Sequence, residues 1–194
     1  GDMSNQIMLW DIQSGKLVRK MSESLGVFSV RFSADGRYLY TKSALTALSG
    51  ISRWDVATGK QVSSLLIDDV FPVAGHDFYL YEEGTQLRDS KNQYFFEAAP
   101  ASITCVELNK ANNLIALGYD DGHVELRRFP SFELEKTYAH VQSRIAYLKF
   151  TQTELIYHAC NGSTLVIHDL VEDKTYKEEF APEIYRTEET GTGF

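Results

Sequence analysis

The clearest metal-binding chemistry in the sequence belongs to a histidine and a cysteine in its last quarter. His158 and Cys160 are two positions apart in an apolar, strand-like run, so their side chains should share one face of the strand. Zinc binds imidazole and thiolate well but needs about four ligands, and no other histidine or cysteine stands at metal-binding spacing. We therefore predict no metal site and no cofactor.

Adjacent carboxylates are the second group with potential chemistry. Asp68-Asp69 and Glu82-Glu83 are direct neighbours, and neighbours on a strand point to opposite faces, which suits paired acid–base catalysis poorly. Asp120-Asp121-Gly122 is typical of a hairpin turn before it is typical of a calcium ligand set. We interpret all of these carboxylates as turn and surface residues.

Two Gly-Lys pairs invite comparison with phosphate-binding loops. Ser14-Gly15-Lys16 and Thr58-Gly59-Lys60 lack the earlier glycine of such a loop, and each stands between strand-like runs rather than ahead of a helix. The Gly-x-Ser-x-Gly elbow of serine hydrolases is also missing. Both pairs are typical of turns, and the sequence predicts no catalytic residue and no enzyme.

Composition narrows the partners and the environment. The chain has 194 residues, a formal net charge of −8 and a sequence pI near 5.1, without a stripe of Lys and Arg, so we expect no nucleic-acid partner. No run reaches the roughly 18 apolar residues of a membrane helix, so we expect no membrane association. Cys105 and Cys160 lie in apolar runs, which predicts two buried, reduced thiols and fits a cytoplasmic location.

An internal repeat organises the chain. Leu9–Lys16 and Arg53–Lys60 both run from an apolar strand through Trp-Asp and a turn to Gly-Lys. Weaker marks follow at Leu87–Asp89, Leu126–Arg128 and Ile167–Asp169, and successive marks lie roughly 34 to 44 residues apart. A Trp-Asp repeat of this length indicates the four-stranded blades of a β-propeller.

Within each repeat the residues alternate as they do in strands. Val27–Phe32 has period 2, and Ser33-Ala34-Asp35-Gly36 forms a turn before further short apolar runs. Asp120-Asp121-Gly122 and Asn161-Gly162 are hairpin turns of later repeats. The predicted domains are a half blade over 1–22, blades over about 27–67, 70–98, 101–138 and 140–180, and a polar C-terminal tail over 181–194.

These marks resemble the WD-repeat family of β-propellers, and the resemblance covers nearly all of residues 1–180. The string Phe-Ser-Ala-Asp-Gly-Arg-Tyr-Leu from Phe32 to Leu39 is similar to the Phe-Ser-Pro-Asp-Gly-x-x-Leu segment of that family's blades. The resemblance implies an all-β fold of four-stranded antiparallel WD-type blades, about four full blades plus a half blade, as a partial or small propeller. It assigns the structural repeat positions to Trp10, Asp11, Trp54, Asp55, Asp89, Asp121, His140 and Asp169.

The family resemblance also places the start of the chain in the middle of a blade. Gly1-Asp2, ahead of Trp10, matches the turn between the second and third strands of a blade. Three explanations compete: earlier blades of a longer protein complete the ring, two copies combine as a homo-oligomer, or residues near Glu183 to Arg186 supply a closing strand to a small ring. We favour the first, because a half blade leaves an unpaired strand edge that promotes aggregation.

Function follows from the resemblance only in general terms. WD-repeat propellers imply a non-catalytic protein–protein interaction scaffold that binds partner proteins through its loops and faces, with the partner's identity left open. Arg88, Arg127 and Arg128 are the candidate partner-binding residues, because arginine is enriched in binding hot spots, and they have aromatic neighbours at Phe129, Phe132 and Tyr138.

The alternative is a propeller enzyme with a metal or cofactor site in its central channel. Such a site needs polar side chains from several blades to converge, and the sequence offers no histidine or carboxylate repeated at equivalent blade positions.

Overall fold

The protein is built from β-strands in a repeated antiparallel pattern. The computed structural model describes residues 5–23, 26–43, 50–65, 67–91, 93–98, 100–139, 141–160 and 164–179. These residues form four sheets of four strands and one sheet of two, with all neighbouring strands antiparallel and consecutive in sequence. The predicted all-β fold of four-stranded blades with one half blade is confirmed.

The sheets are numbered here as blades in chain order, with the half blade first. The half blade contains β1 (Gln6–Trp10) and β2 (Leu17–Ser22). The second blade contains β3 (Val27–Phe32), β4 (Tyr38–Ser43), β5 (Ile51–Asp55) and β6 (Gln61–Leu65). The third contains β7 (Asp69–Val73), β8 (His76–Tyr81), β9 (Gln86–Asp89) and β10 (Phe95–Glu97). The fourth contains β11 (Ile103–Asn109), β12 (Leu114–Tyr119), β13 (Val124–Arg128) and β14 (Leu134–Tyr138). The fifth contains β15 (Ile145–Phe150), β16 (Glu154–Ala159), β17 (Thr164–Asp169) and β18 (Lys174–Glu179).

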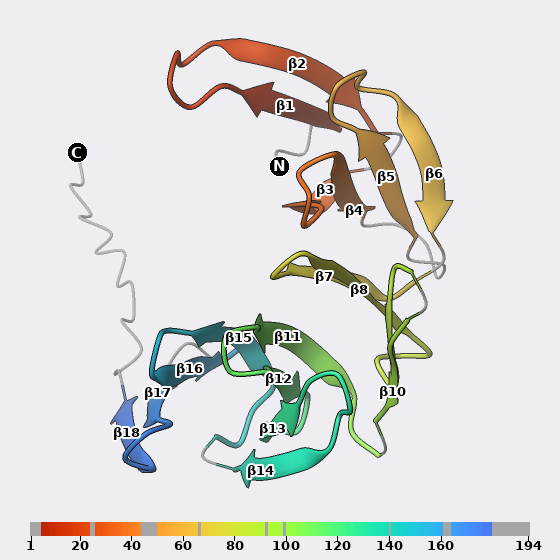
Figure 1. The fold of residues 1–194 in the computed structure, drawn as a ribbon. Coiled ribbons are helices and arrows are strands. Elements are labelled where there is room, and N and C mark those ends of the chain that lie inside the picture. The colour runs from red at the N-terminus through yellow and green to blue at the C-terminus, as the bar shows by residue number, and fades with distance from the viewer. Residues whose placement is uncertain are drawn as a thin grey trace, which may run out of the picture.

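The blades stand side by side along an arc, as Figure 1 shows. The first strand of each complete blade (β3, β7, β11 and β15) lies toward the centre of the arc, and the fourth strand lies toward its periphery. Each complete blade therefore begins with a strand beside the central space, and the chain enters the blade at one end of that space. No helix in the described ranges is long and apolar enough to cross a membrane.

The aspartates of the Trp-Asp marks hold the turns that follow them. The carboxylate of Asp11 accepts a hydrogen bond from the Ser14 N–H at 2.7 Å, and that of Asp55 accepts one from the Thr58 N–H at 2.8 Å. Asp169 likewise accepts the Val171 N–H at 2.8 Å. Because such bonds favour the ionised carboxylate, the pKa values of Asp11, Asp55 and Asp169 lie below their usual range.

The two tryptophans of the repeat have different environments. Trp54 is buried, and its indole N–H donates to the Thr41 hydroxyl at 3.0 Å, which in turn donates to the Glu23 carboxylate at 2.8 Å. Glu23 lies in the segment that leads into the second blade, as His140 lies in the segment that leads into the fifth. His140 itself lies outside the described residues. Trp10 is 53% exposed because only one face of the half blade is covered.

The interface between the third and fourth blades is apolar. Phe78 and Leu80 of β8 pack against Ile103, Ile115 and Leu117 of the fourth blade, and all five side chains are nearly or fully buried. A comparable cluster joins the fourth and fifth blades. Burial of such surface contributes roughly 25 cal/mol per Å², so these contacts dominate the stability of the three blades.

The close approach of the fourth and fifth blades depends on a glycine. A Cβ at Gly118 of β12 would stand 2.7 Å from the Cys105 sulfur and 2.8 Å from Cγ2 of Ile145. A side chain at this position would therefore push β15 away from the fourth blade.

The interface between the second and third blades is smaller and more polar. Its buried cluster contains Tyr40, Ile51, Ile67, Val70 and Tyr79. The Tyr40 hydroxyl lies 3.0 Å from an Asp77 carboxylate oxygen and 3.1 Å from the Tyr79 hydroxyl. Hydrogen bonds thus replace much of the apolar contact that joins the later blades.

One of the two cysteines departs from the sequence prediction. Cys105 is largely buried, and burial raises the pKa of its thiol to about 12, so it stays protonated and unreactive. Cys160 is free and exposed, which makes the prediction of two buried thiols wrong for this residue. The reason is local: β16 ends at Ala159, and Cys160 begins the turn, where its side chain leaves the alternation of the strand.

Candidate functional site

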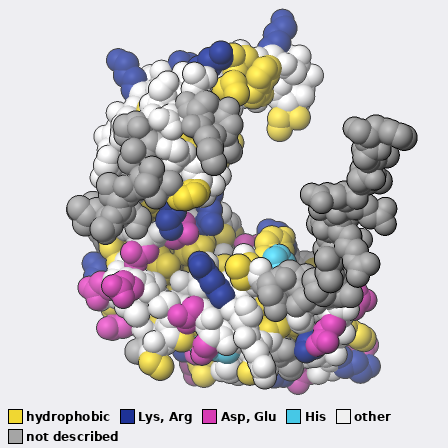
Figure 2. All heavy atoms as spheres, turned by 180° about the vertical axis from the view of Figure 1, so that it is seen from behind, with side chains coloured by type: hydrophobic (Ala, Val, Ile, Leu, Met, Phe, Trp, Pro, Cys, Tyr) yellow, Lys and Arg dark blue, Asp and Glu magenta, His cyan; other side chains and the backbone are white. Residues whose placement is uncertain are grey.

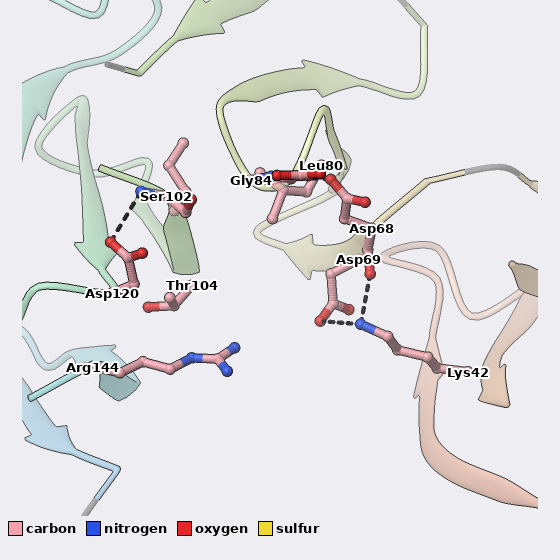
Figure 3. Close-up of a pocket in the computed structure, with 11 residues that line it drawn as sticks. Lys42, Asp68, Asp69, Leu80, Gly84, Ser102, Thr104, Asp120 and Arg144 are labelled. Atoms are coloured by element: carbon pink, nitrogen blue, oxygen red, sulfur yellow. Dashed lines mark hydrogen bonds and ion pairs between the residues drawn. The ribbon is translucent and has the colours of Figure 1, made fainter. Parts of the chain in front are cut away.

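A polar groove of about 320 Å³ opens where the second, third, fourth and fifth blades meet the central space. We call it the channel-mouth groove. Its lining comes from the beginnings of inner strands, from the ends of the second strands β4 and β8, and from turns beside them, as Figure 3 shows. The lining residues are Lys42, Asp68, Asp69, Leu80, Glu83, Gly84, Ser102, Ile103, Thr104, Asp120 and Arg144.

One wall of the groove is a charged corner between the second and third blades. The Lys42 ammonium donates to the Asp68 carbonyl at 2.6 Å and lies 3.5 Å from the Asp69 carboxylate. The Arg31 guanidinium approaches the same carboxylate at 3.7 Å and donates to the Val70 carbonyl at 2.5 Å. These contacts hold the Asp69 carboxylate between two cations. They leave it little ability to accept a further hydrogen bond from a ligand.

Two further carboxylates hold the backbone at the rim of the groove. Asp68 accepts a hydrogen bond from the Gly84 N–H at 3.0 Å, and Asp120 accepts one from the Ser102 N–H at 3.0 Å. These aspartates tie the turns of the third and fourth blades to the chain segments beside them. Glu83, in contrast, is exposed and makes no hydrogen bond or ion pair with the described part of the chain.

Arg144 faces this charged wall from the opposite side. It directly precedes β15 and is exposed, and Figure 3 shows its side chain reaching across the groove toward Asp69 and Lys42. Its guanidinium makes no hydrogen bond or ion pair with the described residues. The groove therefore presents five N–H donors of one arginine that have no acceptor among the described residues.

This arrangement suits binding better than catalysis. The described residues contain no group of three His, Cys, Asp or Glu placed to hold a metal ion. The groove lining has a serine and a threonine but no histidine that could activate them. Thr104 is also engaged, because its hydroxyl donates to the Ile145 carbonyl at 2.7 Å. What the groove offers is a set of donors and acceptors around an open space.

The predicted partner-binding arginines lie elsewhere. Arg88 and Arg127 are half-buried inside the third and fourth blades, at the strand positions that Trp54 occupies in the second. Arg127 forms an ion pair with Glu125 at 2.7 Å. Arg128 is exposed and pairs with Glu135. Their role in partner binding stays a prediction.

Two of the aromatic neighbours expected beside these arginines are not on the surface. Phe132 is 7% exposed and Tyr138 is 3% exposed, because both side chains pack into the interfaces between blades. Burial raises the pKa of the Tyr138 hydroxyl to about 12. Phe129 is partly buried against the same core.

Sequence reasoning did not single out Lys42, Thr104 or Arg144, and it took Asp69 for a surface residue. A signal for them exists, because Asp69, Thr104 and Arg144 stand within two residues of the start of an inner strand in three successive repeats. Aligning the repeats on their strand starts would have brought these residues to one mouth of the central space.

Comparisons with known proteins bear on the fold. No protein-family model matches the sequence, and no curated protein matches it. Among solved structures, the chain is similar to a chain in the "Crystal Structure of Mitotic Checkpoint Complex", with a TM-score of 0.68 and 11% identity, covering 88% of this chain and 59% of that chain.

Of two further solved structures, one is described as a WD40 domain and the other as a β-propeller domain. The C-terminal WD40 domain of Sif2 has a TM-score of 0.70 and 13% identity, and covers 92% of this chain and 53% of that chain. The Cps50 (Swd1) β-propeller domain of Myceliophteria thermophila has a TM-score of 0.62 and 17% identity, and covers 87% and 60%. The chain thus spans between 53% and 60% of the length of these structures, and its resemblance to WD-repeat propellers is confirmed at the level of fold.

Proposed function

From the WD-repeat β-propeller fold of this chain, we infer that it acts as a non-catalytic protein-interaction module. A rigid set of blades presents many loops at its two faces, and loops of this kind carry binding. One of the similar structures supports protein partners in general, because it belongs to a complex by its own description. It does not identify a partner for this chain.

The observation that carries the proposal is the open guanidinium of Arg144 in the channel-mouth groove. An arginine whose guanidinium has no acceptor in the described part of the chain is available to a partner, and arginine is among the residues that dominate binding energy at protein interfaces. Its planar N–H groups match a carboxylate in a two-point contact. The partner segment therefore carries an acidic side chain or a chain-terminal carboxylate that reaches Arg144.

The rest of the groove sets what accompanies that carboxylate. The exposed Glu83 carboxylate and the Ser102 side chain also line the groove, and Glu83 has no hydrogen bond or ion pair with the described residues, so its carboxylate is open to an N–H donor. Lys42 and Asp69 already neutralise each other's charge, so they line the groove without offering a charged contact to a partner. An extended segment with an acidic group and exposed backbone amides fits this pattern.

The test compares variants of the chain as bait in quantitative affinity capture from cells that express the protein. Arg144→Glu reverses the charge in the groove, whereas Arg37→Glu makes the same change at an exposed site outside it. We expect at least one captured protein to fall about tenfold or more with Arg144→Glu, since a hot-spot contact is worth about 2 kcal/mol, and to stay with Arg37→Glu. If both variants capture the same proteins equally, the groove does not bind the partner.

A cytoplasmic location belongs to the same proposal. Both cysteines are free, and Cys160 is exposed, which supports a reducing compartment. Thiol labelling of Cys160 in cell extracts, before any reductant is added, would check this point. No observation in the described residues favours the alternative of an enzyme with a site in the central channel.

A further inference from the structure

A second cavity, of about 280 Å³, lies between the third and fourth blades, away from the channel-mouth groove. We call it the interblade pocket. On one side it is bounded by β10 and the chain that leads from β10 toward β11, and on the other by β12, β13 and the turn between them. Its lining residues are Phe96, Glu97, Ala98, Pro100, Ala101, Tyr119, Asp121, His123, Glu125 and Arg127.

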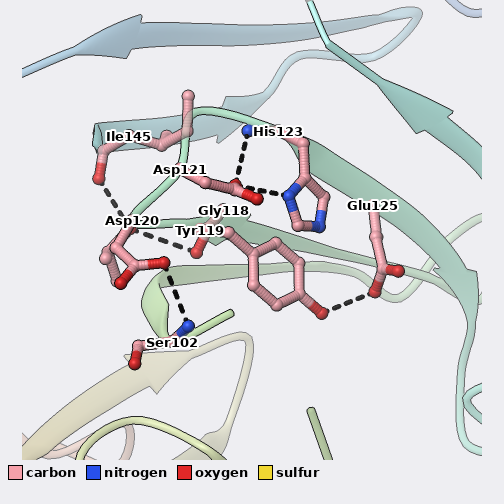
Figure 4. Close-up of polar contacts among 9 residues, drawn as sticks. Ser102, Gly118, Tyr119, Asp120, Asp121, His123, Glu125 and Ile145 are labelled. Carbon is pink, nitrogen blue, oxygen red and sulfur yellow. Dashed lines mark hydrogen bonds and ion pairs between the residues drawn. The ribbon is translucent and has the colours of Figure 1, made fainter. Parts of the chain in front are cut away.

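One side of the pocket is a stacked pair of rings held by an aspartate. The His123 imidazole lies parallel to the Tyr119 ring, with 4.0 Å between ring centres and 12° between planes. The Asp121 carboxylate contacts Nδ1 of His123 at 2.5 Å, as Figure 4 shows. An acceptor at Nδ1 keeps the proton of the neutral ring on that nitrogen, so Nε2 is an acceptor.

The other side shows how a guanidinium is bound here. Arg127 places its guanidinium over the Phe96 ring at 4.5 Å and pairs with the Glu125 carboxylate at 2.7 Å. The same carboxylate oxygen accepts the Tyr119 hydroxyl at 2.5 Å. Aromatic rings and carboxylates thus already combine in this pocket to hold one cation.

The pocket has more acceptors than its own donors can use. Glu97 is exposed and makes no hydrogen bond or ion pair with the described part of the chain, and only one oxygen of Glu125 is engaged. Nε2 of His123 and the second oxygen of Asp121 are also open to a donor. Three carboxylates face one cation, so the lining keeps a negative excess of two charges when His123 is neutral.

We propose that the interblade pocket binds an arginine side chain of a partner protein. A guanidinium supplies several donors and one positive charge, and its planar face stacks on an aromatic ring such as the outer face of His123. The Glu97 carboxylate pairs with the guanidinium at the open side of the pocket, and the Asp121 carboxylate pairs with it beside His123. The inference rests on the proposed interaction function, but it concerns a different surface and a partner group of opposite charge.

The probe is the capped tripeptide acetyl-Gly-Arg-Gly-amide, titrated into the isotope-labelled full chain and followed by NMR. Matched peptides carry citrulline or lysine in place of arginine. We expect saturable shifts at Phe96, Glu97 and His123 with the arginine peptide and none with the citrulline peptide, which has the same shape without the charge. Glu97→Gln should weaken the arginine peptide about fivefold, which is the upper range for one exposed ion pair. Glu133→Gln, an exposed carboxylate outside the pocket, should leave binding unchanged.

The other outcomes overturn the proposal. Equal shifts with citrulline would show that charge is not recognised, and equal or tighter binding of lysine would exclude a guanidinium-specific pocket. Shifts spread over acidic residues outside the pocket, or no saturable shift at all, would remove the site altogether. Failure here leaves the Arg144 capture experiment unaffected, so the two proposals fail separately.

Discussion

Two neighbouring residues on β8 belong to two different kinds of interface. Phe78 points to the fourth blade and is fully buried among apolar side chains. Tyr79, the next residue, points to the second blade and ends in hydrogen-bonding distance of the Tyr40 hydroxyl. Because side chains alternate along a strand, one strand presents an apolar face to one neighbour and a polar-tipped face to the other.

The two interfaces on either side of β8 therefore differ in how well they tolerate rearrangement. Apolar contact is non-directional and scales with buried area, so the junction of the third and fourth blades resists separation in proportion to its size. The junction of the second and third blades depends on directed groups such as Asp77, which accepts hydrogen bonds from the Tyr40 hydroxyl and from the Ala34 N–H. A small loss of geometry there removes several contacts together.

The largest expected effect comes from removing an apolar side chain at the junction of the third and fourth blades. Phe78→Ala should lower the free energy of unfolding by about 3 to 5 kcal/mol, since it removes a fully buried ring and leaves a cavity. Phe28→Ala is the matched control, because Phe28 is 72% exposed and its loss should cost about 0.5 kcal/mol or less. Urea unfolding of both variants measures the difference, and similar losses would contradict the assignment of Phe78 to the core.

A smaller effect is expected on the polar side. Tyr79→Phe keeps the ring and removes only the hydroxyl that meets Tyr40, so stability should fall by about 1 kcal/mol. Tyr81→Phe changes the same strand face at a hydroxyl without a hydrogen bond in the described part of the chain, and it should be nearly neutral. A loss for Tyr79→Phe as large as for Phe78→Ala would mean that the two junctions are not different in kind.

The smallest effect concerns the turns after the third strands of the half blade, the second blade and the fifth blade. The pKa values of Asp11, Asp55 and Asp169 should lie below 3.8 in the folded chain, because turn hydrogen bonds favour the ionised carboxylates. A lowered pKa adds stability that is complete above the unfolded value and disappears as the pH falls through the folded value. Carboxyl NMR titration checks this, and Ser14→Ala should raise the pKa of Asp11 while that of Asp55 stays unchanged.

The repeat could be predicted from the sequence because each blade repeats the same local physics. Trp-Asp, a turn and Gly-Lys mark a third strand, a capped turn and a fourth strand, and the fold follows from counting these marks. Environment could not be predicted in the same way. Trp10 and Trp54 stand in the same motif, yet only Trp54 is covered, because the cover depends on what stands beside the blade.

The candidate sites were harder to predict than the fold for a related reason. Arg127 is conspicuous in the sequence, but it replaces a tryptophan inside its blade and pairs with Glu125. Arg144 is inconspicuous between Ser143 and Ile145, and only the arrangement of blades brings it across from Asp69. Residues that contact one another across blades are far apart in sequence, so no local sequence pattern predicts that they lie together.

The junctions between blades differ along the arc, so we expect them to differ in their resistance to a mechanical load. Each blade contacts only its neighbours, so a load applied along the chain meets the junctions one after another. Met8, Trp10 and Ile12 are exposed hydrophobic side chains of the half blade and the turn that follows β1. Figure 2 shows hydrophobic groups, in yellow, at this end of the molecule. Under tension we expect the Tyr40–Tyr79 junction to separate before the two apolar junctions that join the third, fourth and fifth blades.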